Sequence, residues 1–268
     1  MFAVHDVTVS FGDLLALDEV SLDAAPGAVT TIVGGDGAGK STLLKVLAGR
    51  VRPDSGTVSA ASSGELGMLP ATAGSWGNLT VRQNLEFSAT AFGLQRSRLR
   101  ERTEELITAA GLEPARDRLA SALSGGMRRK LGVIMALVGS PQLVLLDEPS
   151  TGVDPVSRVE LWRLISRAAA DGAAVITTTT YLDEAERASR FLALESGRAL
   201  LGGTPAAVKA SAQGAFWAAK ERQGALAWRR GRWWHHWAPV LPADATRQQP
   251  DLHDLVVAAA LRAEEHSR

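Results

Sequence analysis

A glycine-rich turn between an apolar run and a helical pattern limits the fold of this chain more than any other feature. Residues 29–33 (Val-Thr-Thr-Ile-Val) form a short β-branched run, which is typical of a buried strand. The turn Gly-Gly-Asp-Gly-Ala-Gly-Lys-Ser-Thr follows at 34–42, and apolar residues at helical spacing then continue to Gly49. The pattern GxxxxGK[ST] between a strand and a helix predicts a P-loop, which holds a phosphate chain. We therefore expect an α/β domain built around this loop.

Each residue type in the loop suits phosphate binding. Glycines let backbone N–H groups turn toward a β-phosphate, and the start of the helix adds its dipole. We expect Lys40 to reach the β- and γ-phosphate oxygens of ATP, and the Ser41 hydroxyl to ligate Mg²⁺. An ordinary glycine-rich turn is the alternative, and the flanking strand and helix disfavour it. The predicted ATP-binding residues of the loop are Gly34, Gly35, Asp36, Gly37, Ala38, Gly39, Lys40, Ser41 and Thr42.

A second apolar run ends in two carboxylates. Residues 142–146 (Gln-Leu-Val-Leu-Leu) are followed by Asp147 and Glu148. A P-loop site needs an acidic strand beside its own, because Mg²⁺ requires an anionic anchor opposite Ser41. Asp147 suits that role, through a water molecule, and Glu148 is the predicted catalytic residue that orients or deprotonates the attacking water.

Between these two motifs lies Leu-Ser-Gly-Gly-Met at 123–127, which opens an apolar-faced helix ending near Gly139. Ser124 is a good N-cap, and the two glycines would let a phosphate approach the first helical N–H groups. With this motif in place, residues 2–205 resemble the ATP-binding cassette (ABC) family. The resemblance implies a P-loop NTPase fold with a mixed sheet core, an antiparallel β subdomain and a helical subdomain. We expect an ATP-binding domain over 1–205, with the helical subdomain at about 72–122, and a small C-terminal extension over 206–268.

The resemblance also implies roles for residues outside the P-loop. Phe11 resembles the aromatic residue on which adenine stacks, although a core phenylalanine at a strand end fits its local sequence equally well. Asp154 resembles the D-loop aspartate that contacts an opposite subunit, and Tyr181-Leu-Asp-Glu-Ala-Glu is similar to drug-exporter cassettes. In the family, the signature helix contacts the ATP of a second cassette, which implies a head-to-tail dimer with two sandwiched ATPs. The predicted signature residues are Ser124, Gly125, Gly126 and Met127.

Two positions depart from the family pattern. Ala71 stands where the family has a glutamine near Mg²⁺ and the attacking water, and Thr180 stands where the family has a histidine that contacts the γ-phosphate. Alanine has no ligand atom, and threonine offers a shorter and neutral donor. We therefore expect the site on this P-loop to bind ATP and to hydrolyse it slowly, as one member of an asymmetric cassette pair.

Composition restricts the class of partner. The 29 basic and 29 acidic side chains cancel, which disfavours nucleic acid as a partner, and the absence of cysteine excludes disulfides and thiolate metal sites. No basic stretch followed by an apolar run opens the chain, and no apolar stretch approaches the roughly 20 residues that span a bilayer. We expect a peripheral protein at the cytoplasmic face of the membrane, in contact with the membrane only through a permease subunit.

The last 60 or so residues carry five tryptophans in an Ala- and Arg-rich stretch. A membrane-interface anchor and a metal site are possible interpretations of Trp-Trp-His-His-Trp at 233–237, but we favour the core of a small accessory domain. His235 and His236 are adjacent, so on a strand they would point to opposite sides and would not hold one metal. A closing amphipathic helix is expected from about residue 250.

The expected function is therefore the ATP-binding subunit of an ABC transporter of the exporter type, working with a second cassette and a transmembrane permease. One alternative is a soluble, non-transport ABC ATPase acting on ribosomes or DNA. A single compact cassette without cysteine or a basic patch disfavours that alternative. A second alternative is an ATP-sensing scaffold, which Ala71 and Thr180 keep open.

Overall fold

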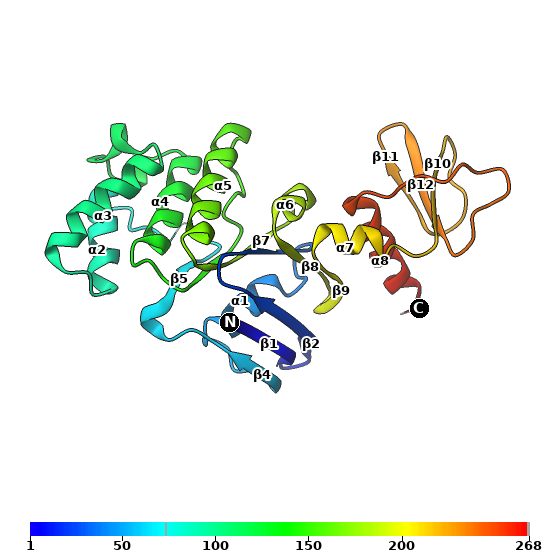
Figure 1. Cartoon of the computed structure of the whole chain (residues 1–268), viewed down its shortest axis with the longest axis horizontal. Coiled ribbons are helices and arrows are strands. Elements are labelled where there is room, and N and C mark those ends of the chain that lie inside the picture. Colours follow the sequence, from blue (N-terminus) through cyan, green and yellow to red (C-terminus); the bar gives the residue numbers. More distant parts are fainter. Residues whose placement is uncertain (73, 267–268) are drawn as a thin grey trace.

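The computed structural model describes residues 1–72 and 74–266, and a central sheet of six strands runs through this part of the chain (Figure 1). Neighbouring strands are parallel except at one edge, where β9 pairs antiparallel with β8. Every residue of β3, β6 and β7 is buried, which explains why these strands are continuous apolar or β-branched runs. In sheet order the strands are β5 (Leu66–Leu69), β6 (Leu143–Leu146), β7 (Ala174–Thr179), β3 (Val29–Val33), β8 (Arg190–Glu195) and β9 (Arg198–Gly203).

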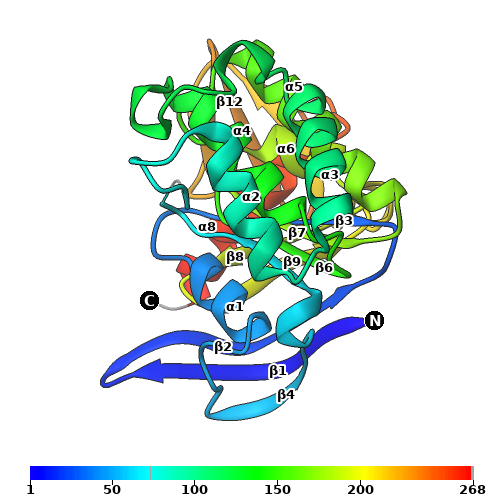
Figure 2. The same ribbon diagram turned by 90° about the vertical axis from the view of Figure 1, so that its left-hand side faces the viewer.

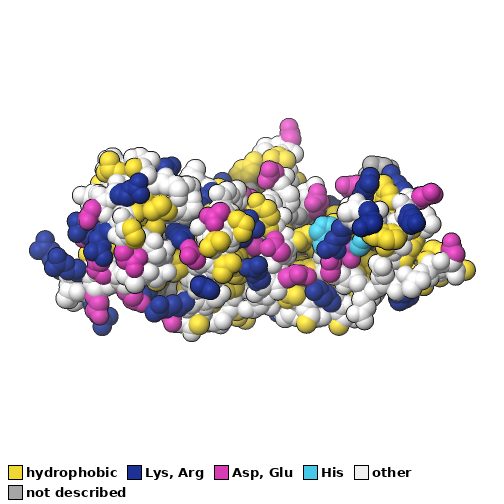
Figure 3. Space-filling view, turned by 90° about the horizontal axis from the view of Figure 1, so that it is seen from above, with side chains coloured by type: hydrophobic (Ala, Val, Ile, Leu, Met, Phe, Trp, Pro, Cys, Tyr) yellow, Lys and Arg dark blue, Asp and Glu magenta, His cyan; other side chains and the backbone are white. Residues whose placement is uncertain are grey.

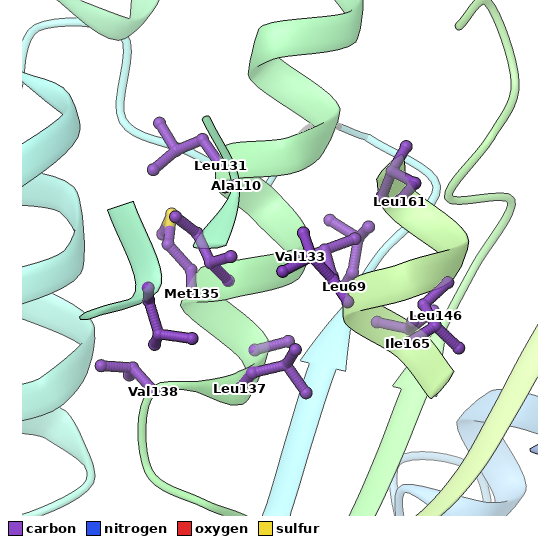
Figure 4. Packing of buried hydrophobic residues seen from close by; sticks show 14 of the residues in the cluster. Leu69, Ala110, Leu131, Val133, Met135, Leu137, Val138, Leu146, Leu161 and Ile165 are labelled. Atoms are coloured by element: carbon purple, nitrogen blue, oxygen red, sulfur yellow. The ribbon is translucent and has the colours of Figure 1, made fainter. Parts of the chain in front are cut away.

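Side chains alternate across this sheet and feed two separate cores. Val144 and Leu146 of β6 join a cluster with the helices on one face, whereas Leu143 and Leu145 join a cluster on the other face. Figure 4 shows the first cluster, in which Val133 of α4 points toward Leu69 of β5. The helices that contribute to this cluster are α2 (Val81–Ala91), α3 (Arg96–Ala109), α4 (Gly125–Leu137) and α5 (Pro155–Ala170).

The opposite face is covered by α1 (Lys40–Leu47) and by a second, antiparallel sheet. This sheet has the order β2-β1-β4 and lies below α1 in Figure 2. The fold is thus the predicted ABC-type α/β fold, with its mixed sheet and its antiparallel subdomain. The strands of the second sheet are β1 (Phe2–Phe11), β2 (Leu14–Ala24) and β4 (Ser55–Ser59).

Local capping sets the helix boundaries in the predicted helical subdomain. The Thr80 hydroxyl accepts a hydrogen bond from the Gln83 amide at 3.2 Å, and the Gln83 side chain accepts one from the Thr80 amide at 2.9 Å. This capping box starts α2 at Val81. Gly111, in the left-handed region at φ 63°, follows the end of α3. Residues at the helix ends themselves therefore set the start of α2 and the end of α3.

The C-terminal extension forms a three-stranded antiparallel sheet and a closing helix. Trp217 and Trp228 are buried in it, whereas Trp233 is 42% exposed and does not join the core. His236 stacks on Trp217 at 5.1 Å between ring centroids, and His235 pairs through Nδ1 with Asp254 at 2.9 Å, so the two histidines do point to different partners. The elements are α7 (Pro205–Ala210), β10 (Ala215–Ala219), β11 (Ala227–Arg230), β12 (Trp233–Ala238) and α8 (Leu252–His266).

The extension is packed onto the cassette and shares a core with it. Val33 of β3 and Phe191 of β8 lie in the same buried cluster as Phe216 and Leu255 of the extension. The short helix α6 (Leu182–Arg187) contributes Ala185 to this cluster. The end of the P-loop strand is therefore covered by residues from the far end of the chain.

Charged side chains of both signs are interspersed over the face seen from above in Figure 3. This mixture agrees with the net charge of zero. Among the described residues, none of the helices combines the length and the apolar character needed to cross a membrane.

Candidate active site

The glycine-rich loop joins β3 to α1 in a conformation that only glycine adopts without strain. Gly37 and Gly39 have φ of 79° and 101°, in the left-handed region. A Cβ atom at Gly39 would stand 2.7 Å from the Ala16 carbonyl oxygen, so the loop is also held tightly against β2. Gly39 is the N-cap of α1 and provides no side-chain cap, and α1 has no acidic residue in its first turn. The first amides of α1 are therefore suited to binding an anion.

Lys40 is buried and is folded back over its own loop. Its Nζ donates to the carbonyl oxygens of Gly34 and Gly35 at 2.8 and 2.9 Å, and it lies 3.4 Å from Oε1 of Glu148. A buried ammonium group needs such partners, because its charge is poorly solvated. A phosphate group entering the loop offers the same charge compensation, so Lys40 has to exchange these partners for phosphate oxygens.

The two carboxylates at the end of β6 are positioned by a threonine that the sequence did not single out. Thr178, fully buried in β7, donates its hydroxyl to Oδ1 of Asp147 at 2.6 Å and accepts the Glu148 amide at 2.9 Å. Glu148 has φ 49°, a strained value for a residue with a side chain, and the amide contact helps to hold it there. Its Oε2 accepts a hydrogen bond from Thr151 at 3.1 Å.

Lys40 and Glu148 both line one cleft of about 460 Å³. Phe11 lines the cleft and is 50% exposed, so it is not a core phenylalanine. Leu14, Leu15 and Ser196 also line it, and no motif in the sequence indicated them. The predicted site residues in the lining are Phe11, Asp36, Gly37, Ala38, Gly39, Lys40, Ser41, Thr42 and Glu148.

The donor atoms around the ion pair of Lys40 and Glu148 fit a magnesium ion. Ser41 lines the cleft, and Asp147, which directly precedes Glu148 in the chain, is buried with its Oδ1 hydrogen-bonded to Thr178. Mg²⁺ prefers such oxygen ligands and retains several water molecules. Ser41 and Asp147 are the residues that would hold it, and the ion would neutralise charge on a bound phosphate chain.

The signature residues lie at the start of α4 and do not contribute to the lining of this cleft among the described residues. Ser124 caps the helix, accepting the Met127 amide at 3.3 Å, and Gly125 is exposed. Asp154 lies beside the signature, since its Oδ2 would be 3.7 Å from a Cβ atom at Gly126. The Ser157 hydroxyl and amide, followed by the Val156 amide, donate to Asp154 and hold its pKa below the ordinary value.

The two divergent positions are both exposed. Ala71 follows β5, and its carbonyl oxygen accepts a hydrogen bond from Nη2 of Arg129 at 2.8 Å. Thr180 follows the last residue of β7, and next to it the Tyr181 ring lies under the Arg158 guanidinium at 4.5 Å from the ring centroid. A smaller cavity of about 230 Å³ lies between Thr180, the start of the P-loop and α8.

Comparisons with known proteins agree with this geometry. Residues 17–151 match the model of the family described as ABC transporter. The chain is 40% identical over 192 residues to the probable multidrug ABC transporter ATP-binding protein YbhF of Escherichia coli, covering 68% of this chain and 33% of that protein. The chain therefore spans about a third of the length of that relative.

Two further matches cover more of the compared protein. The Nod factor export ATP-binding protein I of Paraburkholderia xenovorans is 34% identical over 216 residues, 76% of this chain and 71% of that protein. A solved structure described as the ATP binding subunit of an ABC transporter aligns with a TM-score of 0.72 and 26% identity, over 78% of this chain and 92% of that chain.

Proposed function

The chain is an ATP-binding cassette of the ABC transporter family, a family of ATPases, and we propose that it is the ATP-binding subunit of an exporter. In this proposal a separate permease subunit crosses the membrane and this chain lies against it on the cytoplasmic side. The names of the relatives, a multidrug transporter protein and an export protein, support the direction of transport. Residues 1–205 are the ATP-binding domain, and residues 206–268 are an accessory extension.

The observation that carries the proposal is the meeting of Lys40, Ser41 and Glu148 at one cleft, with Asp147 directly behind. This set provides an anion cradle, a cation, ligands for Mg²⁺ and a base. Phe11 at the mouth of the cleft offers an aromatic face for adenine, and such stacking contributes about 1–3 kcal/mol per base. ATP with Mg²⁺ is therefore the proposed ligand.

By the family pattern, two side chains that would assist hydrolysis are replaced in this chain. Ala71 offers only a methyl group, and Thr180 offers a neutral hydroxyl. Loss of one charge-assisted contact of about 1.5–3 kcal/mol, if made only in the transition state, slows turnover roughly tenfold to a hundredfold. We propose that this chain's own site hydrolyses ATP poorly.

The signature is intact, and it is proposed to serve a partner cassette. Gly125 is exposed and α4 is capped by Ser124, so the first amides of α4 can receive a phosphate from outside the chain. Asp154, beside Gly126, would lie at the same contact between cassettes. The proposed assembly is a head-to-tail pair in which the second cassette is a different chain or domain.

The surface proposed to contact the permease lies in the helical subdomain. Trp76 and Phe87 are 43% and 52% exposed and pack edge to face, with ring centroids 4.3 Å apart. Exposed aromatic pairs of this kind are typical of interaction surfaces. The adjoining hollow is lined by Leu79, Gln83, Glu86, Phe87, Thr90 and Ala91.

The isolated chain tests the weak-site proposal. Calorimetry should detect MgATP binding, which Lys40→Ala should weaken, while turnover stays far below that of an ordinary transporter ATPase. Rapid turnover that Glu148→Gln abolishes would contradict the weak site. If the chain bound ATP with no turnover and copurified with no membrane subunit or second cassette, the sensing-scaffold alternative would replace the exporter.

A further inference from the structure

Arg129 connects the signature helix to the carboxylates of this chain's own nucleotide site. It lies one turn before Val133 on α4, and Val133 points toward Leu69 at the end of β5 (Figure 4). Helical side chains lean toward the N-terminus of their helix, so Arg129 extends past the end of β5. There its Nη2 donates to the Ala71 carbonyl oxygen at 2.8 Å.

The second terminal nitrogen of the Arg129 guanidinium, Nη1, is buried and makes no hydrogen bond among the described residues. A buried N–H donor without an acceptor is costly, and such a group in a functional region indicates a ligand or an alternative partner. The unpaired donor belongs to the same guanidinium that contacts Ala71, the position at which the family has a glutamine.

Asp147 and Glu148 are the charges that act on Arg129. The Asp147 amide donates to the Leu69 carbonyl oxygen at 2.8 Å, which ties the acidic pair to the segment that Arg129 contacts. Burial lowers the pKa of the Arg129 guanidinium from its ordinary value, while the charges of Glu148 and then Asp147 act to raise it. The two carboxylates thus stabilise the charged guanidinium through longer-range electrostatic attraction and not through a hydrogen bond.

ATP binding would change which cation pairs with the Glu148 carboxylate. In the present structure Lys40 lies 3.4 Å from Glu148 and donates to Gly34 and Gly35. A phosphate chain in the loop draws Lys40 away, and a γ-phosphate then stands opposite Glu148 with charge of the same sign. A magnesium ion held by Ser41 and Asp147 would offset part of the repulsion between these like charges, and a cation beside Glu148 would offset more of it.

We propose that Arg129 is a positioning residue. When ATP, rather than ADP, occupies this chain's own P-loop, Arg129 replaces Lys40 as the cation that pairs with the Glu148 carboxylate. This inference rests on the proposed function, since it places ATP in the cleft. Arg129 lies two residues after Met127 of the signature on the same helix.

The test is the affinity of the full chain for MgATP and for MgADP, measured by calorimetry at low temperature. Arg129→Gln retains a donor for Ala71 but removes the charge, and it should weaken MgATP binding about tenfold while MgADP binding changes less than about twofold. Arg129→Lys retains the charge and should bind MgATP within about threefold of the wild type. Arg128→Gln is the control, because Arg128 is bound to the Ser121 carbonyl oxygen instead.

A double-mutant cycle with Glu148 separates this role from a structural one. In a Glu148→Gln background the γ-phosphate faces a neutral amide, so Arg129→Gln should then cost MgATP binding less than about twofold. Equal losses for MgATP and MgADP, or an undiminished loss in the Glu148→Gln background, would overturn the inference. If Arg129→Gln does not fold, Arg129→Lys decides in the same way: weakened MgATP binding with the charge retained would overturn it. A wild-type chain that bound neither nucleotide would instead overturn the proposed function.

Discussion

Two buried threonines on neighbouring strands should respond oppositely to the same substitution. Thr178 of β7 and Thr30 of β3 are both fully buried, and at each position valine keeps the β-branched shape while a methyl group replaces the hydroxyl. The Thr178 hydroxyl bonds Asp147 at 2.6 Å and the Glu148 amide at 2.9 Å, whereas Oγ1 of Thr30 has no partner in the described part of the chain. The pair isolates what one bonded hydroxyl contributes.

The magnitude follows from these contacts. Thr178→Val removes one hydrogen bond to a charged group, about 1.5–3 kcal/mol, and leaves the partly buried Glu148 amide without this partner, which costs at most about 1–3 kcal/mol. We therefore expect Thr178→Val to lower the free energy of unfolding by about 3 kcal/mol. Thr30→Val removes a polar atom that is buried without a partner, so it should be neutral or stabilise by about 1 kcal/mol.

Urea unfolding followed by circular dichroism measures both variants, and the slopes must match for the midpoints to be compared. Thr178→Ser, which retains the hydroxyl, should recover most of the lost stability. Equal destabilisation by Thr178→Val and Thr30→Val would refute the reasoning, because it would show that shape rather than hydrogen bonding determines the cost.

Two further predictions concern the C-terminal extension. Ending the chain at Ala210 should lower the melting temperature, because the truncation uncovers Val33 and Phe191. The folded fraction should retain its MgATP affinity, since every cleft-lining residue precedes the cut. A large loss of affinity in a well-folded truncation would contradict this. Burial lowers the pKa of His236, whose Nε2 accepts the Gln223 amide at 2.9 Å, so its contribution to stability should be complete above its unfolded pKa of about 6.5 and should be lost as the pH falls below that value. A thermal melt series from about pH 7.5 to 5.5 checks this, and an equal acid response in His236→Gln would contradict it.

The sequence predicted the parts of the site that are contiguous in the chain. The P-loop is recognisable because strand, glycines, lysine and helix follow one another, and β3 ends at Val33, where its β-branched run ends. The cap at Ser124 is local in the same sense, since it bonds an amide three residues away.

The parts that the sequence did not predict depend on pairing between distant segments. Thr178 looks like any threonine in a strand, and only the parallel register of β6 and β7 brings it level with Asp147. Arg129 looks like a solvent-facing residue of a charged helix start, and only the packing of α4 along β5 directs it to Ala71. The apolar face of α8 was visible as a pattern, but its contact with the P-loop strand was not.

The central proposal is that this chain's own site hydrolyses ATP poorly while its signature motif completes the partner's site. The most direct test is the ATPase activity of the reconstituted complex. Gly125→Asp places a carboxylate where the partner's γ-phosphate would bind the exposed start of α4, so activity should collapse. Glu148→Gln removes a base from a site that already lacks two helpers, so total activity should fall only slightly. If Glu148→Gln is as damaging as Gly125→Asp, the site on this chain is a working one and the asymmetric account is wrong.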